Sequence, residues 1–142
     1  MAKVNTDRLK YLEMIQSIIS RMANNSVLIK GWIITLSLAG FTLFASKHEN
    51  IYLSLIIFSV LIFWILDGYY LRQEKLFREL YEDHARISKK ELNHFSMNTK
   101  KHDGKIINII WCLLSFPTSA IYLFILLVTL VFLYLSLYVW RW

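Results

Sequence analysis

Three long apolar runs, separated by polar segments, dominate the pattern along this chain of 142 residues. They cover residues 27–46, 51–70 and 118–140. Each is close to the length of about 20 apolar residues that crosses a hydrocarbon core of about 30 Å. Lys30 is the only charged residue in the first run and Asp67 the only one in the second. We therefore predict an all-α membrane protein with three transmembrane helices.

Residues 1–26 have a different pattern, with apolar side chains at three- and four-residue spacing. The members of this face are Leu9, Leu12, Ile15, Ile19 and Met22. The segment is too polar to span, so we expect an amphipathic cytoplasmic helix that packs on another helix or lies at the membrane surface. Asn24 to Ser26 should interrupt this helix, and Ser26 should cap the next one, because short polar side chains compete with helical backbone bonds.

Polar residues 47–50 predict a turn that joins the first two runs in a helical hairpin. Residues 71–105 are charged, and their first part should continue the second helix. Phe77, Leu80, His84 and Ile87 recur there at helical spacing, while the tail from Asn93 should be a polar loop.

A short apolar piece, residues 106–116, precedes the only proline, Pro117. Eleven residues are too few to span a bilayer, so we predict a short interfacial or re-entrant helix that ends or kinks at the proline.

Composition and charge agree with this topology. Apolar residues make up 56% of the chain and charged residues 18%. Outside the runs, four Lys or Arg precede residue 27 and nine lie in 71–105, against one in the hairpin turn and one at the carboxyl end. Basic residues gather on the cytoplasmic side. We therefore expect a multi-pass protein of the bacterial inner membrane with a cytoplasmic amino terminus and a periplasmic or extracellular carboxyl terminus.

Lys30 and Asp67 are equidistant from the centre of the hairpin turn. An antiparallel hairpin then places them at the same depth, and charges inside membranes usually pair. We predict an ion pair near the cytoplasmic end of the hairpin. Independent snorkelling of the two side chains, or a role in a pore or gate, are the alternatives.

Four hydroxyl side chains recur every seven residues in the last apolar region: Ser115, Tyr122, Thr129 and Ser136. They form one helix face, which either packs tightly against another helix or lines a narrow water path in an oligomer. Gly31, Thr35 and Ala39, at spacing four in the first run, also favour close helix packing.

The segment after Asp67 is rich in basic residues with interleaved aromatic ones. The candidate ligand contacts are Arg72, Lys75, Arg78, Arg86, Lys89, Lys90, Lys100 and Lys101. Such residues suit phosphate contacts and base stacking with single-stranded nucleic acid or a nucleotide. They equally suit anionic lipid headgroups, or serve only as a topology signal on a solvated helix.

Motifs for catalysis or metal binding are not found. The four histidines form no ligand cluster, and the single Cys112 is best explained as a small buried side chain. The sequence has no phosphate-binding loop, serine-nucleophile or zinc-protease motif. We expect no enzymatic activity, no cofactor and no metal.

Two stretches carry more specific information about the protein's family than the composition does: RMANNSVLIKGW at 21–32 and FWILDGYYLRQEKLFRELY at 63–81. They resemble a family of small bacterial membrane effectors encoded beside nucleotidyltransferases in anti-phage operons, the family of the Hailong defence-system effector. The resemblance covers about residues 5–90. It implies an oligomeric ion channel that a single-stranded DNA or oligonucleotide ligand, made by the nucleotidyltransferase partner, holds shut. Loss of the ligand would open the channel and depolarise the membrane.

Three classes of function follow for this chain. The first is a homo-oligomeric, channel-like effector controlled by a nucleotide or single-stranded nucleic acid, because a three-helix protomer is too thin to enclose a pore. The second is a non-conducting membrane anchor or assembly subunit for a cytoplasmic partner protein. The third is a component of a membrane enzyme or transporter.

Overall fold

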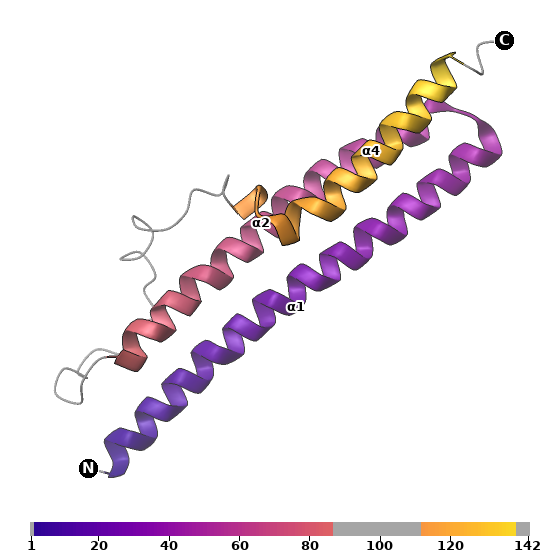
Figure 1. The fold of residues 1–142 in the computed structure, drawn as a ribbon. Helices are drawn as coiled ribbons and strands as arrows, with labels where there is room; N and C mark the ends of the chain where they lie inside the picture. The colour runs from indigo at the N-terminus through magenta and orange to yellow at the C-terminus, as the bar shows by residue number, and fades with distance from the viewer. Residues whose placement is uncertain (1, 87–111, 139–142) are drawn as a thin grey trace.

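The computed structural model describes residues 2–86 and 112–138, which form three long helices (Figure 1). α1 spans Ala2–Lys47, α2 spans Asn50–Arg86 and α4 spans Phe116–Tyr138. Each helix is long and apolar enough to cross a membrane, as predicted, which suits a membrane-embedded protein.

The predicted hairpin turn is confirmed and is even tighter than expected. Only His48 and Glu49 lie outside the two helices. The His48 backbone N–H donates to the Phe44 carbonyl at 2.7 Å, and His48 has a φ of 57°. A residue in this left-handed conformation is a common way to end a helix. α1 and α2 therefore run antiparallel along each other (Figure 1).

The predicted interruption at Asn24 to Ser26 is wrong, because α1 runs through these residues without a break. The Ser26 side chain is buried and bonds to α2 instead of competing for its own backbone. Helix propensity is a weak preference that packing on both sides of a short polar segment overrides. The amino-terminal segment and the first apolar run are thus one helix.

Two separate apolar clusters hold the helices together. One contains the buried residues Ile33, Phe44, Leu53, Ile56, Val60, Tyr122 and Ile125. The other lies at the open end of the hairpin and contains Tyr11, Ile15 and Leu80. The predicted inner face of residues 1–26 is therefore partly wrong: Ile15 is buried, but Leu9 is 58% exposed and Tyr11 takes its place.

The open end of the hairpin is also fastened by polar contacts. The Arg8 guanidinium donates to the carbonyls of His84 and Ala85 at 3.1 and 2.9 Å. Cations favour the carboxyl end of a helix, where carbonyls have no partner within the helix. The Tyr11 and His84 rings lie 5.1 Å apart. These contacts keep the first turns of α1 against the last turns of α2.

α4 packs mainly on α2, along the half of the hairpin near the turn (Figure 1). It begins after a turn at Leu114 and a bend at Ser115, so Pro117 lies in its first turn, where a missing N–H is tolerated. Within the predicted interfacial helix of residues 106–116, Cys112 and Leu113 are helical, Leu114 and Ser115 form the turn and bend, and Phe116 already belongs to α4. Residues 106–111 and the predicted polar loop lie outside the described residues.

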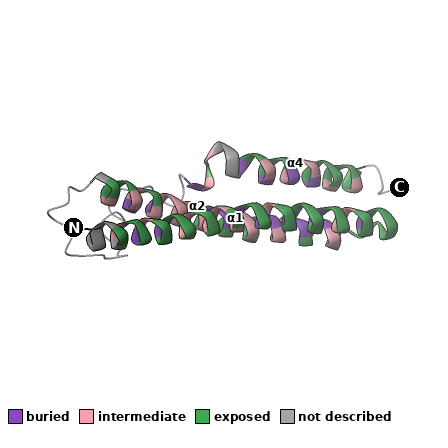
Figure 2. Cartoon of the chain, turned by 90° about the horizontal axis from the view of Figure 1, so that it is seen from below, coloured by how far each residue is buried: buried purple, intermediate pink, exposed green. Residues whose placement is uncertain are grey.

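Exposed positions, in green, lie along all three helices (Figure 2). Many of them are large apolar residues, such as Trp32, Phe58 and Phe124. The buried residues form only a narrow stripe along each helix, as expected where the surrounding medium is hydrocarbon instead of water.

Gly40 marks the closest approach of α1 to α2. A Cβ built at Gly40 would lie 2.6 Å from Cγ1 of Ile56, whereas one at Gly31 would meet nothing within 4 Å. We expect Gly40→Ala to destabilise the hairpin by about 1–3 kcal/mol through overpacking, and Gly31→Ala to be neutral or stabilising. Thermal unfolding in detergent measures both. Equal effects of the two substitutions would contradict this packing.

Candidate functional site

A buried ion pair lies where the apolar halves of α1 and α2 meet their charged halves. The Asp67 side chain is fully buried. The Lys30 ammonium lies 2.7 Å from one carboxylate oxygen and 3.0 Å from the other. The predicted Lys30–Asp67 pair is therefore formed, and the equal distance of the two residues from the turn is what aligns them.

Two hydroxyl groups complete this pair. Ser26 lies one helical turn before Lys30, donates to the Asp67 carboxylate and accepts from the Lys30 ammonium at 2.7 Å. The second hydroxyl, that of Tyr122 from α4, belongs to a ring that stacks on Trp64, one helical turn before Asp67. It is buried and has no hydrogen-bond partner among the described residues. We call Ser26, Lys30, Asp67 and Tyr122 the Asp67 cluster.

The Asp67 cluster joins all three helices. Ser26 and Lys30 come from α1, Asp67 from α2 and Tyr122 from α4. The Tyr122 ring stacks on Trp64, with 6.1 Å between the ring centroids and 9° between the planes. α4 is thus packed on α2 within one helical turn of Asp67.

The residues just before α4 are held at the same level. The Trp64 indole donates to the Leu113 carbonyl at 3.0 Å. Gly68 allows the Leu113 side chain to lie against α2, because a Cβ there would be 2.4 Å from Cδ2 of Leu113. The segment that starts α4 is therefore anchored within one turn of Asp67.

The chemistry of the Asp67 cluster is electrostatic. Its only carboxylate is already neutralised by a lysine, so a metal ion would have to displace Lys30. Over residues 2–86 and 112–138, no three His, Cys, Asp or Glu side chains gather into a metal site. A buried ion pair costs desolvation and is therefore weak evidence for stability, but removing one partner leaves an uncompensated charge. The cluster is suited to coupling helices.

The four side chains of the predicted hydroxyl stripe lie on the inner side of α4 or at the bend before it. Tyr122 and Thr129 are fully buried, and Thr129 donates to the Ile125 carbonyl at 2.7 Å. Ser136 donates to the Asn50 side chain at 2.6 Å, and Ser115 is half-buried at the bend before α4. Of the two interpretations of this stripe, its burial favours helix packing over pore lining.

A different polar face is left uncovered, on α1. Gly31, Thr35, Thr42 and Ser46 are exposed and, at 3.6 residues per turn, fall within an arc of about 60°. The hydroxyls of Thr35, Thr42 and Ser46 each donate to the backbone carbonyl four residues earlier in α1. We call these four residues the α1 polar face. Gly31, Thr35 and Ala39 are exposed, and a Cβ at Gly31 would meet nothing within 4 Å, so the close packing predicted for this spacing is not seen at Gly31 among the described residues.

The predicted ligand-binding residues are only partly described. Arg72 and Lys75 are half-buried on α2, and Arg78 is exposed but pairs with Glu74 at 2.7 Å. The structure describes Arg86 only as the last residue of α2. Lys89, Lys90, Lys100 and Lys101 lie outside the described residues.

Sequence reasoning missed two members of the Asp67 cluster as such. Ser26 was expected only as a helix cap, and Tyr122 only as part of the hydroxyl stripe. The signal for Ser26 is its position four residues before Lys30, which places both side chains on one face of a helix. For Tyr122, no sequence signal sets the depth of α4 relative to the hairpin, because the intervening connection is long.

Comparison of this chain with family models, with curated proteins and with solved structures found no match in any of the three. Its function has to be inferred from its own residues and their arrangement.

Proposed function

We propose that the chain is an oligomeric, ion-channel-like membrane effector of bacterial anti-phage defence, controlled by a nucleotide or single-stranded nucleic acid ligand and depolarising the membrane when open. The three helices able to cross a membrane support the membrane role. The resemblance of residues 21–32 and 63–81 to effectors encoded in anti-phage operons supports the biological role.

The observation that carries the proposal is the Asp67 cluster. Ionisable residues within membrane-spanning helices are costly and usually functional. Here a buried carboxylate and a lysine lie at the boundary between charged and apolar halves of the hairpin, one helical turn from the Trp64 ring on which Tyr122 of α4 stacks. A ligand-dependent shift of the charged halves would therefore reach α4 through this cluster.

Conduction needs several copies, because α4 packs on α2 and leaves α1 on one side, so one protomer encloses no channel. We assign the conducting face to the α1 polar face in place of the hydroxyl stripe of α4. Exposed hydroxyls can replace part of an ion's hydration shell, and small residues allow helices to approach closely around an axis.

The proposed topology places the open end of the hairpin in the cytoplasm of a bacterial inner membrane and the turn at His48 on the opposite side. The basic residues then face the cytoplasm, where an oligonucleotide made by a nucleotidyltransferase partner would meet them. Binding there would hold the charged halves of α1 and α2 in the closed arrangement.

A non-conducting anchor or assembly subunit is the second candidate. The burial of Tyr122 and Thr129 favours it, because it removes the hydroxyl stripe of α4 as a pore lining. An anchor would use the charged halves of the hairpin to hold a cytoplasmic protein and would leave the membrane sealed.

Expression of this chain alone tests the two candidates. We expect a potential-sensitive dye to report depolarisation within minutes of induction, because no partner is present to supply the closing ligand. Cells carrying the empty vector should keep their potential. A steady potential, with the protein shown to be in the membrane, would favour the anchor.

Ligand binding has its own test in the basic segment. Replacing Arg86, Lys89 and Lys90 by Glu should weaken the binding of a fluorescent single-stranded oligonucleotide by the purified protein and reduce its salt dependence. The plot of log affinity against log salt should become shallower by about 2, since each lost phosphate contact contributes about 0.7 for single strands. Lys10→Glu, on an exposed position of α1, is the control that should change little. Binding by the triple variant that persists at high salt would rule out this ligand site.

A further inference from the structure

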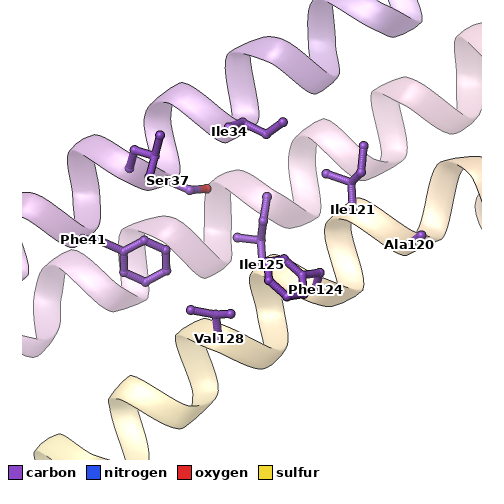
Figure 3. A pocket seen from close by; sticks show the side chains of 9 residues that line it. Ile34, Ser37, Phe41, Ala120, Ile121, Phe124, Ile125 and Val128 are labelled. Carbon is purple, nitrogen blue, oxygen red and sulfur yellow. The ribbon is translucent and has the colours of Figure 1, made fainter.

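An apolar groove runs between α1 and α4 (Figure 3). It consists of two hollows of about 440 and 550 Å³ that share Leu38 and Phe41. Residues such as Phe124 and Val128 form its α4 wall. Its α1 wall is formed by four residues at spacings of four, three and four: Ile34, Leu38, Phe41 and Ala45.

A second row of apolar residues with the same spacing lies on another side of α1. These residues are all exposed, and we call them the α1 ridge: Trp32, Leu36, Ala39 and Leu43. At 3.6 residues per turn, the α1 ridge and the α1 wall of the groove lie about 80° to either side of the α1 polar face. Alternating spacings of three and four are typical of helices that pack along one another, whereas contact with lipid requires no such repeat. α1 therefore has two apolar contact surfaces, with the polar face between them.

We propose that the groove binds the α1 ridge of a second copy of this chain, with the two α1 helices parallel. This inference rests on the proposed function and deepens it, because it names the contact through which several copies would surround the α1 polar face. Each copy uses its groove on one side and its α1 ridge on the other, so the contact is heterologous and can repeat around a closed ring.

The packing of α1 on α2 suits such a ring. Gly40 marks the closest approach of α1 to α2, and Ile33 and Phe44 belong to the buried cluster that joins the two helices. These three positions lie about 180° around α1 from the centre of the α1 polar face. With the polar faces turned to a common axis, α2 would therefore lie on the outside of the ring.

Side-chain sizes on the two surfaces of α1 are complementary in this arrangement. Copies related by rotation about an axis along the membrane normal place residues of the same number at the same depth. Phe41 of the groove then lies close to the level of Ala39 of the α1 ridge, and Leu43 of the ridge lies close to the level of Ala45 of the groove. Large side chains opposite small ones let two helices approach closely and fill the space between them.

The α4 wall of the groove also meets a matching surface. A hollow of about 210 Å³ between α1 and α2 is bordered by Leu36 and Leu43 of the α1 ridge and by Tyr52. When the ridge lies in the groove of the next copy, Phe124 of that copy, which is 68% exposed, faces this hollow. At about 200 Å² for a fully exposed large side chain, the two surfaces offer about 1,000 Å² in total, the area that a specific interface needs.

Disulfide crosslinking between copies tests this contact. Leu43→Cys and Ala45→Cys are combined in the full chain, with the buried Cys112 replaced by Ala. Residues two apart on a helix do not face each other, so these cysteines cannot pair within one α1. Oxidation in vesicles should convert most of the protein into a ladder of dimers, trimers and larger species on a non-reducing gel. Protein that is inserted in the membrane and stays monomeric would overturn the proposal.

Three controls define what the ladder means. Leu43→Cys alone and Ala45→Cys alone should stay monomeric, because the heterologous contact pairs one position with the other. Phe58→Cys combined with Ile65→Cys, at exposed positions of α2 outside the contact, should also stay monomeric. Strong dimers from either single variant would show a two-fold contact instead, and an equal ladder from the α2 pair would show random collision. Both results would overturn the proposal.

Potassium flux into the same vesicles separates this contact from conduction. A ladder from vesicles that stay sealed without ligand would retain the contact between α1 helices and remove the channel. Flux through wild-type protein whose cysteine variant gives no ladder would retain the channel and overturn the contact.

Discussion

Replacing Lys30 by Met is expected to lower the free energy of unfolding by about 3–5 kcal/mol, among the largest effects of any single substitution in this chain. The substitution keeps most of the side-chain volume and removes the positive charge. Asp67, which is fully buried, would then lose its counter-charge and keep only the Ser26 hydroxyl as a donor. Chemical unfolding in detergent measures the loss.

A double-mutant cycle separates the pair from its surroundings. Lys30→Met combined with Asp67→Leu should recover most of the stability, because no charge is then left buried. The Glu74–Arg78 pair on α2, whose arginine is exposed, is the control, and its i,i+4 interaction should contribute only about 0.3–0.5 kcal/mol in a double-mutant cycle to Ala. If the double variant is as unstable as Lys30→Met alone, Lys30 does not act through Asp67.

The same double variant separates the contribution of the ion pair to protein stability from its proposed role in coupling the hairpin to α4. With the ion pair gone and the fold retained, the Asp67 cluster no longer carries a charge. On the proposed function, this variant inserts normally but no longer responds to the oligonucleotide ligand.

Replacing Thr35 and Thr42 together by Leu is expected to abolish depolarisation while leaving the amount of membrane-inserted protein unchanged. Both side chains are exposed and bond only to carbonyls within α1, so they hold no part of the protomer together. In an assembled channel, two leucines per copy would close the conducting face with apolar surface. Membrane potential in expressing cells and quantitative immunodetection of the protein measure the two effects.

The controls for this substitution lie on the other helices. Ser54→Leu on α2 changes an exposed hydroxyl that also bonds to its own helix, and it should leave depolarisation intact. Thr129→Leu on α4 changes a fully buried residue, so it should reduce the yield of folded protein. Full depolarisation by the Thr35→Leu/Thr42→Leu variant would remove the α1 polar face from the conduction path.

Hairpin geometry was predictable because two independent signals agree on it. The polar turn sets the centre of the hairpin, and the lone charges at positions 30 and 67 are equidistant from that centre. A register error of one or two residues would rotate Asp67 away from Lys30 by 100° or more. The ion pair thus tests the register, and the structure confirms it.

The continuity of α1 could not be predicted from local sequence alone. Three short polar residues at 24–26 favour a break by propensity, and only the partner helix shows that Ser26 has a buried acceptor in Asp67. The prediction that Leu9, and not Tyr11, lies on the inner face of α1 was wrong for a similar reason. Tyr11 contacts the His84 ring, more than 70 residues away in sequence, and periodicity carries no information about that contact.

The role of the hydroxyl stripe, four side chains at a spacing of seven residues, could be decided only once the position of α4 was known. A stripe of this kind is compatible with packing or with a water path, and its sequence does not say which surface meets it. Once α4 lies on α2, Thr129 is buried and Ser136 bonds to Asn50. The exposed hydroxyls of α1 stand out only after the buried positions are known.

Ion flux into vesicles tests conduction most directly, because it removes any ligand that a host cell supplies. Purified protein is reconstituted in vesicles loaded with a potassium-sensitive dye, alongside the Thr35→Leu/Thr42→Leu and Ser54→Leu variants. The proposed channel predicts potassium flux through the wild-type protein and Ser54→Leu, none through the double variant, and closure on addition of a single-stranded oligonucleotide. Vesicles that hold correctly inserted wild-type protein and stay sealed without ligand would contradict the channel and leave the membrane anchor.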